Sequence, residues 1–285
     1  MIQEKLTILI ILYQENIDVI KKCLDQLKKF KVIIIDNAND KDLKNKLIED
    51  YNIHKYFLNK SNIGFSKAAN QGILECDTEY MFLLGADCII SNEDIEKLMN
   101  ARKKYKNCFL TSPTFYNSNG GHDYNGGPFY EEGLPMNVLN NFGDVCVNTV
   151  LTTAILFKIE DIKNIGLFDE EFFLYFLDFD MCRRIKNEKK AVIQVYESKA
   201  IHTHGSLKIK NKLKKIFFRN FYFEYEELYY LFKVNLHYEK YNKLKKKIPN
   251  YLLKLIMNFI ILRFDKFTYY LAKILAFQKF KKLIK

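Results

Sequence analysis

The stretch Leu6-Thr7-Ile8-Leu9-Ile10-Ile11-Leu12-Tyr13 decides the fold, because it is a continuous apolar run of the length typical of a buried strand. Two further runs, Val32-Ile33-Ile34-Ile35 and Tyr80-Met81-Phe82-Leu83-Leu84, repeat this pattern. Segments with helical periodicity separate the three runs. Continuous apolar strands that alternate with helices predict a mostly parallel sheet covered on both faces, and the fold class is therefore α/β.

Ligands of such sheets bind beyond the carboxyl ends of the strands. Tyr13, Asp36 and Asp87 follow three of the apolar runs, so we expect them at one edge, where a nucleotide would bind. The Asp36 carboxylate could accept a hydrogen bond from N3–H of uracil or thymine. The alternative is an Asx turn, which is the commoner role of such a residue after a strand.

The segment from Asn62 to Gly72 predicts a helix with a small face. Asn62 can cap this helix, Gly64 allows the backbone to approach a neighbour closely, and Lys67 can face a phosphate. By itself the pattern is also typical of an ordinary capped helix.

Asp87 follows a buried strand, a usual place for a carboxylate that binds a metal. In the segment His202-Thr203-His204, both imidazoles would face the same side of an extended strand. One of them could join Asp87 on a hard divalent cation carried by a diphosphate. The alternative is a polar strand end without a ligand.

Residues 166–184, called here the aromatic–carboxylate element, read Gly-Leu-Phe-Asp-Glu-Glu-Phe-Phe-Leu-Tyr-Phe-Leu-Asp-Phe-Asp-Met-Cys-Arg-Arg. Apolar surroundings and a neighbouring carboxylate both raise a carboxyl pKa, which makes Asp178 a candidate general base with Asp180 beside it. The alternative is a helix start, in which Asp178 caps the helix and the helix dipole favours Asp180.

Between residues 114 and 148 the composition shifts to Gly, Asn and aromatic residues. A connection of this length is usually a functional loop or a disordered one. Its aromatic, Asn and Asp side chains suit stacking on sugar rings and hydrogen bonding to them, and a plain surface loop is an equal alternative. After this loop we expect a strand over residues 147–157 and a short one over residues 191–196.

In this order and spacing the motifs resemble the inverting glycosyltransferases of family 2, in particular the rhamnosyltransferase-like and galactofuranosyltransferase-like branch. The resemblance covers residues 6–206. The family's successive motifs correspond to Leu12–Gln14, Asp36–Asn39, Asn62–Gly72, Leu84–Asp87, Gly166–Arg184 and His202.

The resemblance implies a GT-A fold, a UDP- or dTDP-linked sugar donor and a glycan or lipid-linked acceptor of cell-surface polysaccharide synthesis. Asp178 would be the general base, while Asp87 and His202 would bind Mg²⁺ or Mn²⁺ on the donor diphosphate. The residues expected to contact the donor nucleotide are Tyr13, Asp36, Asn62, Gly64, Lys67 and Asn70. The residues with supporting roles would be Asp180, Arg184 and His204.

Two positions depart from the family pattern. Gly85 stands where the motif often has its first acidic residue, which leaves Asp87 as the only carboxylate of that motif. Leu177 replaces the Glu that normally precedes the base. A catalytically degenerate relative of these enzymes is therefore the first alternative.

The charge of the chain is divided unevenly. Residues 207–285 hold 20 Lys and Arg against 5 Asp and Glu, and residues 1–206 hold 25 against 29. We therefore expect a domain at residues 1–206 and a basic, amphipathic helical extension at residues 207–285 that binds an anionic membrane surface. The alternative is that the extension packs on the domain and exposes its lysines to solvent. The longest uncharged stretch near the end, residues 255–262, is too short to span a bilayer.

The six cysteines form no Cys-x-x-Cys pair, which fits a reducing compartment. The expected location is therefore the cytoplasm, on the cytoplasmic face of the inner membrane. A non-catalytic protein that binds lipid or nucleic acid through its basic extension is the second alternative. The extension carries no recognisable nucleic-acid motif, so we expect no nucleic-acid partner.

Overall fold

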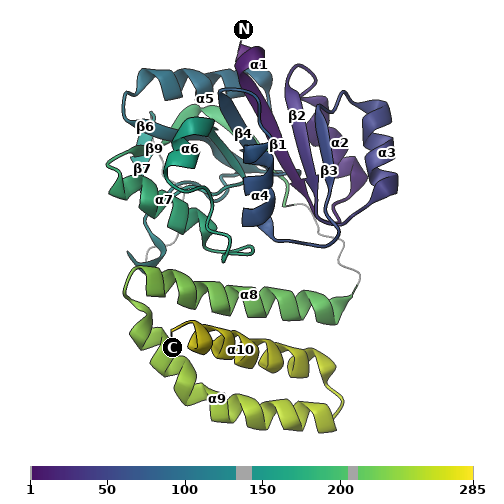
Figure 1. Ribbon diagram of the computed structural model, residues 1–285, viewed down its shortest axis with the longest axis vertical. Helices are drawn as coiled ribbons and strands as arrows, with labels where there is room; N and C mark the ends of the chain where they lie inside the picture. Colours follow the sequence, from purple (N-terminus) through teal and green to yellow (C-terminus); the bar gives the residue numbers. More distant parts are fainter. Residues whose placement is uncertain (1, 133–142, 205–210, 285) are drawn as a thin grey trace. The chain divides into compact units, whose positions relative to one another are not determined.

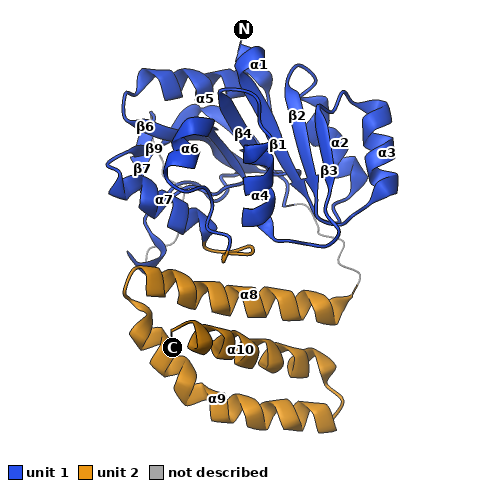
Figure 2. Ribbon diagram, viewed as in Figure 1, with its two compact units in different colours: residues 1–170, 177–208 blue, residues 171–176, 209–285 orange. Residues whose placement is uncertain are grey.

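The computed structural model describes residues 2–132, 143–204 and 211–284. The chain divides into two compact units (Figure 2). The first comprises residues 1–170 and 177–208, and the second comprises residues 171–176 and 209–285. The domain boundary expected at residues 206 and 207 lies outside the described residues.

The first unit alternates strands with helices along most of its length (Figure 1). Its strands are β1 (Leu6–Leu12), β2 (Lys31–Asp36), β3 (Lys55–Leu58), β4 (Tyr80–Leu84), β5 (Cys88–Ile90), β6 (Cys108–Asn117), β7 (Val145–Val147), β8 (Ala154–Lys158) and β9 (Ala191–His202). Its helices are α1 (Ile2–Lys5), α2 (Ile17–Asp25), α3 (Lys41–Asp50), α4 (Phe65–Leu74), α5 (Asn92–Lys104), α6 (Ile159–Asn164) and α7 (Leu177–Asn187), with a 3₁₀ turn, η1, at Tyr130–Glu132.

Within the described residues the strands form one mixed sheet in the order β3-β2-β1-β4-β8-β6-β9-β5, and β7 pairs with β9. The β3-β2-β1-β4 part is parallel, as the apolar runs predict. The expectation of parallel pairing also holds for β6 with β9, but β8 pairs antiparallel with β4 and β6, and β5 and β7 pair antiparallel with β9.

Two strands differ in extent from those that the sequence predicts. The strand expected over residues 147–157 is divided into β7 and β8, which have different neighbours in the sheet. The strand expected over residues 191–196 continues as β9 to His202, where it pairs with β5. The longer β9 carries His202 to the end of the sheet.

The parallel part of the sheet is covered on both faces. Leu6, Ile8 and Ile10 of β1 belong to a fully buried core that also contains apolar residues of α2, α3 and α5. Leu9, on the opposite face, packs under α4, where Gly72 brings the helix backbone close to the Leu9 side chain. A Cβ at Gly72 would overlap the Leu9 methyl groups, which explains why a helix interior holds a glycine here.

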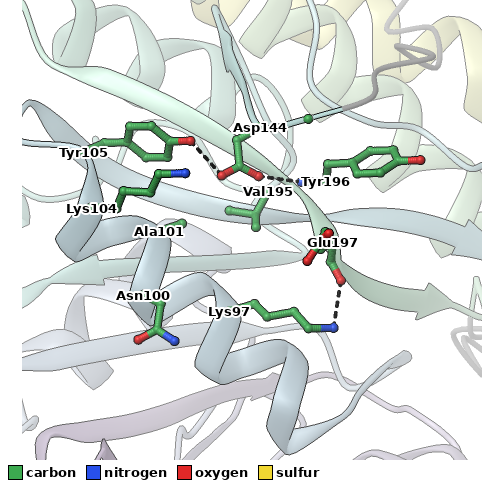
Figure 3. Close-up of a pocket in the computed structure, with 10 residues that line it drawn as sticks. Lys97, Asn100, Ala101, Lys104, Tyr105, Asp144, Val195, Tyr196 and Glu197 are labelled. Atoms are coloured by element: carbon green, nitrogen blue, oxygen red, sulfur yellow. Dashed lines mark hydrogen bonds between the residues drawn. The ribbon is translucent and has the colours of Figure 1, made fainter.

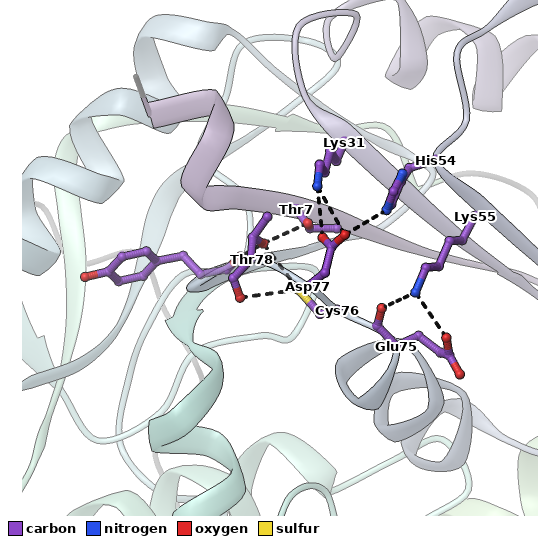
Figure 4. A network of polar contacts seen from close by, with 9 residues as sticks. Thr7, Lys31, His54, Lys55, Glu75, Cys76, Asp77 and Thr78 are labelled. Carbon is purple, nitrogen blue, oxygen red and sulfur yellow. Dashed lines mark hydrogen bonds and ion pairs between the residues drawn. The ribbon is translucent and has the colours of Figure 1, made fainter.

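The edge of the sheet where β2 and β3 begin carries a polar network (Figure 4). Asp77 pairs with Lys31 and with His54, while Lys55 pairs with Glu75. These partly exposed pairs each contribute about 0–1 kcal/mol. Asp36 is the last residue of β2, and Tyr13 and Asp87 follow the corresponding ends of β1 and β4, so the predicted common edge is confirmed.

The second unit contains the helices α8 (Lys212–Lys233), α9 (His237–Ile260) and α10 (Phe264–Leu283). Their common core is formed by Tyr225, Leu228, Leu244, Ala276, Phe277 and Phe280. Three buried glutamates of α8 lie in the same unit, and one of them, Glu224, pairs with Lys240 and Lys273. In the described parts of the chain, no helix combines the length and the apolar character needed to cross a bilayer.

Candidate active site

Asp178 lies in the first turn of α7. Its carboxylate accepts a hydrogen bond from Thr152 Oγ1 at 2.9 Å. Burial of the carboxyl group raises the pKa of Asp178 to about 6, and the Thr152 hydrogen bond acts in the opposite direction. This carboxylate is therefore ionised at neutral pH yet basic enough to accept a proton, as a general base requires.

Asp180 has a structural role in the same turn. Its carboxylate is buried and makes two contacts of 2.9 Å with the guanidinium group of Arg184, one turn further along α7. Arg184 also donates to the Ile165 carbonyl at 2.7 Å. Asp180 and Arg184 thus fix α7 to the segment before the aromatic–carboxylate element.

A cluster of carboxylates and histidines forms where β9 ends. Because β5 and β9 are antiparallel with Cys88 opposite His202, the residue before β5 comes beside the end of β9. His202 Nε2 lies 3.5 Å from Asp87 Oδ2, and His202 Nδ1 lies 3.0 Å from Asp123 Oδ2. His204 Nε2 lies 2.9 Å from the same Asp123 oxygen. Burial lowers the pKa of His202, but the Asp87 and Asp123 carboxylates outweigh burial and raise it overall.

Asp123, His202 and His204 each offer a ligand atom, and these atoms lie within 4.8 Å of one another. Asp123 is a member of the cluster that the motifs did not predict. It lies in the loop after β6, in a Gly-Gly-His-Asp run within the stretch that the sequence marks as a candidate functional loop. Its backbone N–H donates to the Phe115 carbonyl at 3.0 Å, which holds this loop on the sheet.

The turn that holds Asp87 is connected to the Asp178 site through adjacent residues. Gly85 N donates to the Thr153 carbonyl at 2.7 Å, and the neighbouring Thr152 binds the Asp178 carboxylate. A Cβ at Gly85 would come within 3.0 Å of Asp87 Oδ1. The absence of a side chain at Gly85 therefore leaves space beside the Asp87 carboxylate.

The nucleotide edge contains a third carboxyl group that sequence reasoning missed. Glu15 accepts a hydrogen bond from the backbone N–H of Tyr13. Burial raises the pKa of Glu15 to about 7, and the charges of Asp87 and Asp36 add to the increase. Repulsion among the carboxylates of Glu15, Asp36 and Asp87 favours the binding of a cation nearby.

Asp36 ends β2 and is fully buried. It accepts hydrogen bonds from the backbone of Ala38 at 2.6 Å, the backbone of Asp40 at 3.2 Å and the Tyr56 hydroxyl at 3.1 Å. Burial raises its pKa, while these three bonds oppose the increase. The two backbone contacts form the Asx turn that the sequence offered as the alternative to nucleotide binding. Through this turn Asp36 fixes the backbone of residues 36–40 at the edge of the sheet.

The start of α4 differs from the prediction. The helix begins at Phe65 with Gly64 as its N-cap, at φ 89°, a conformation that favours glycine. Asn62 does not cap the helix, because its side-chain oxygen accepts a hydrogen bond from Gly64 N at 3.0 Å instead. Lys67 is exposed in the first turn of α4, as expected for a phosphate contact.

Asn70 has a different task from the nucleotide contact expected of it. Its side-chain oxygen accepts from Phe168 N at 2.9 Å, and its side-chain nitrogen donates to the Phe168 carbonyl at 2.9 Å and to Glu170 Oε1 at 3.1 Å. The amide is buried and occupied by these three bonds. Asn70 therefore fixes the beginning of the aromatic–carboxylate element to α4.

A cavity of about 390 Å³ adjoins the carboxylate–histidine cluster and is lined by Asp87, His204, Thr203, Ser118, Val19, Ile89 and Lys22. Its size and polar lining suit part of a small polar ligand. A separate cavity of about 580 Å³ lies between α5 and β9 (Figure 3). Tyr105 and Asp144 form a hydrogen bond of 2.8 Å there, and none of the expected site residues lines it.

A sheet edge that carries Asp36, Asp87 and Glu15, a carboxylate–histidine cluster and a buried carboxyl group with a raised pKa are the arrangement expected of a GT-A type glycosyltransferase. The model of the glycosyl transferase family 2 matches residues 7–161, which is more than half of the chain. The chain belongs to this family and is a glycosyltransferase, as the resemblance predicted.

Among curated proteins, the chain is 26% identical over 208 residues to the dTDP-rhamnosyl transferase RfbF of Shigella flexneri, covering 70% of each chain. Among solved structures, it resembles GalNAc-T7 crystallised with UDP, GalNAc and Mn²⁺, with a TM-score of 0.61 and 16% identity. It also resembles S. aureus TarS, with a TM-score of 0.54 and 16% identity. The matches cover 71% and 70% of this chain but only 43% and 36% of those two proteins. These two likenesses confirm the fold.

Proposed function

We propose that the protein transfers a sugar, with inversion, from a UDP- or dTDP-linked donor to a hydroxyl group of a glycan or lipid-linked saccharide in cell-surface polysaccharide synthesis. The observation that carries this proposal is the Asp178 carboxyl group, with its pKa raised to about 6 by burial and with a hydrogen bond from Thr152. Asp178 would remove the proton of the acceptor hydroxyl as that oxygen attacks the anomeric carbon. Since one relative is named a dTDP-rhamnosyl transferase, dTDP-rhamnose is the first donor to test.

The donor nucleotide would bind at the carboxyl edge of β1, β2 and β4. Tyr13 and the turn organised by Asp36 would form the base site, while Asn62 and Gly64 would present backbone groups to the donor. Lys67 is exposed and free to approach a phosphate. Its positive charge would favour the diphosphate both before and after the sugar leaves.

The donor set at the end of β9 fits a divalent cation. Asp87, Asp123, His202 and His204 combine carboxylate oxygens with imidazole nitrogens. The two imidazoles favour Mn²⁺ over Mg²⁺, because Mg²⁺ prefers oxygen ligands. Such an ion would neutralise charge on the departing diphosphate. In this arrangement Asp123 provides the second carboxylate that Gly85 cannot provide.

The test measures sugar release and transfer from dTDP-rhamnose and from a panel of UDP- and dTDP-sugars, with Mn²⁺ and with Mg²⁺. Asp178→Asn keeps the shape of the side chain but cannot accept the proton, so turnover should fall at least about 100-fold. Stabilisation of this variant by donor and Mn²⁺ should persist in a thermal-shift assay. Undiminished turnover would refute the base assignment, and no stabilisation of the unaltered protein by any donor would favour the degenerate-enzyme alternative.

We further propose that the second unit binds an anionic membrane surface, on the cytoplasmic face. Nine large apolar side chains between residues 252 and 264 are 45–71% exposed, and they are Leu252, Leu253, Ile256, Met257, Phe259, Ile260, Ile261, Leu262 and Phe264. We call these nine residues the apolar patch. Exposed apolar surface concentrated in this way marks an interaction site.

Basic residues accompany the apolar patch, which favours an anionic lipid surface over an uncharged apolar partner. Lys245, Lys246 and Lys247 are exposed earlier on α9, and Arg263 and Lys266 are exposed at the start of α10. Each basic residue near an anionic membrane contributes about 1 kcal/mol, and each buried apolar side chain contributes about 1.5–3 kcal/mol. The six cysteines are free thiols, which supports the cytoplasmic face.

Flotation with vesicles of phosphatidylglycerol and phosphatidylcholine tests this part of the proposal. Leu253→Asp, at a position 58% exposed within the apolar patch, should weaken vesicle binding about 10- to 100-fold. Leu74→Asp is the matched control, because Leu74 is 61% exposed on α4 of the first unit and should leave binding unchanged. Equal effects of the two substitutions, or binding to oligonucleotides but not to anionic vesicles, would refute it.

A further inference from the structure

The segment Glu171–Phe176 belongs to the helical second unit, although the residues on both sides of it belong to the first (Figure 2). Its aromatic side chains pack on α8. Phe173 stacks on Tyr222 with ring centres 4.0 Å apart, and Phe172 lies 4.9 Å from Tyr229. The second unit therefore includes the middle of the aromatic–carboxylate element.

Glu226 of α8 binds the backbone of this segment directly. Glu226 Oε1 accepts from Phe173 N at 2.7 Å, while Oε2 accepts from Leu174 N at 3.1 Å and from Tyr175 N at 2.6 Å. The Glu226 side chain is fully buried. Burial raises its pKa to about 7, and the three N–H groups and Lys279 act in the opposite direction. Three consecutive N–H groups around one carboxylate fix the path of the backbone at these residues.

The segment ends immediately before the catalytic helix. Phe176 is the last residue before α7, and Asp178 is the second residue of that helix. Phe176 has a positive φ of 59°, an uncommon conformation for a bulky residue, which persists only where the surroundings impose it. Its ring is buried against Phe223 at 5.4 Å and Tyr230 at 5.9 Å, both on α8.

The other end of the element is held separately. Asn70 binds Phe168 and Glu170, three and one residues before the segment begins. Residues 168 and 170 are thus held by α4 within the first unit, and residues 173–176 are held by α8 within the second unit. Residues 173–175, whose N–H groups bind Glu226, lie midway between Glu170 and Asp178 in the sequence.

We propose that Glu226 is a positioning residue for sugar transfer: by binding the N–H groups of residues 173–175 it sets the path of the backbone that leads into Asp178. The second unit then takes part in catalysis as well as in binding a surface. This inference rests on the proposed function of Asp178. A displacement of about 1 Å of a catalytic group can cost about 100-fold in rate, so loss of the carboxylate should lower kcat by about 10- to 100-fold.

The Glu226→Gln variant tests the inference, because it keeps the volume but turns one acceptor oxygen into an NH₂ donor that faces N–H groups. The matched control is Glu224→Gln. Glu224 is also buried on α8, but it pairs with Lys240 and Lys273 of the other helices. Three quantities are compared in both variants: hydrogen exchange of the amides of residues 173–175, kcat with a dTDP- or UDP-sugar that supports turnover, and stabilisation by that donor with Mn²⁺.

In Glu226→Gln, exchange of these amides should be at least about tenfold faster and kcat about 10- to 100-fold lower, with unchanged stabilisation by the donor. Glu224→Gln should change neither the exchange of these amides nor kcat. Faster exchange with unchanged kcat, or an equal loss of kcat in the control, would overturn the positioning role. If the unaltered protein uses no nucleotide sugar, the proposed function fails, whereas unchanged exchange in Glu226→Gln refutes the role of Glu226 whether or not sugar is transferred.

Discussion

The Thr152 hydroxyl group lowers the pKa of Asp178 through a side-chain hydrogen bond, and removing this bond tests the proposed assignment of Asp178 as the base. Thr152 Oγ1 donates to Asp178 Oδ1 at 2.9 Å and lowers a pKa that burial raises to about 6. A hydrogen bond to a charged group contributes about 1.5–3 kcal/mol, and one pKa unit corresponds to about 1.4 kcal/mol. The nearly isosteric Thr152→Val substitution should therefore raise the pKa of Asp178 by about one to two units.

The pH profile of kcat/KM measures this change. Transfer requires ionised Asp178, so kcat/KM of the unaltered enzyme should rise with pH and become constant above its pKa of about 6. In Thr152→Val the rise should occur at a pH about one to two units higher. The variant should then be about 5- to 50-fold slower than the unaltered enzyme at about pH 6, and the two rates should converge near pH 9.

Thr152→Ser is the control, because it keeps the hydroxyl group and should keep the original profile. If Thr152→Val lowered kcat/KM by the same factor at every pH, Thr152 would act on the structure of the site and not on the pKa of Asp178. If the profile did not move at all, a group other than Asp178 would be the titrating base.

Three further predictions concern stability and metal binding. The pKa of Asp178 is raised from 3.8 to about 6 in the folded state, so the protein loses stability as pH rises through this range. The Asp178→Asn substitution should therefore raise the free energy of unfolding, measured in urea, by up to about 3 kcal/mol at pH 8 and leave it unchanged below about pH 4. Equal increases at the two pH values would contradict this prediction. Asp123→Asn should weaken Mn²⁺ binding, followed by electron paramagnetic resonance of the free ion, by about 10- to 100-fold, and unchanged affinity would remove Asp123 from the site. Gly72→Ala should cost about 1–3 kcal/mol of unfolding free energy because the new methyl group would overlap Leu9, and an unaltered midpoint in urea would contradict that packing.

The parts of the fold that the sequence predicts are those with a local signal. The strands β1, β2 and β4 are continuous apolar runs, and their shared edge follows from parallel pairing alone. Asp178 could be found because apolar and acidic residues surround it in the sequence. Its pKa nevertheless depends on Thr152, which lies 26 positions earlier and has no distinguishing neighbours.

Asp123, which sequence reasoning missed, is brought to the site by long-range pairing. Asp123 and His202 are 79 positions apart, and their contact depends on the parallel pairing of β6 with β9 and on the loop that follows β6. The motif singled out Asn70 but predicted a nucleotide contact, whereas its side chain binds the backbone of Phe168, 98 positions away. Periodicity and motif spacing carry no information about contacts between residues so far apart in the sequence. A motif can therefore locate a functional residue without identifying its binding partner.

Leu177 takes the place of a Glu that family members usually have beside the base, and the burial of Asp178 gives a physical reason why the proposed base would not need this Glu. A neighbouring carboxylate raises the pKa of a base by like-charge repulsion, and burial raises it by removing water from the charged form. Leu177 is 2% exposed, and burial is the largest cause of the raised pKa of Asp178. A neighbouring carboxylate and burial both raise the pKa of a carboxyl group. An apolar residue can therefore replace the acidic one while the pKa stays high enough for proton abstraction.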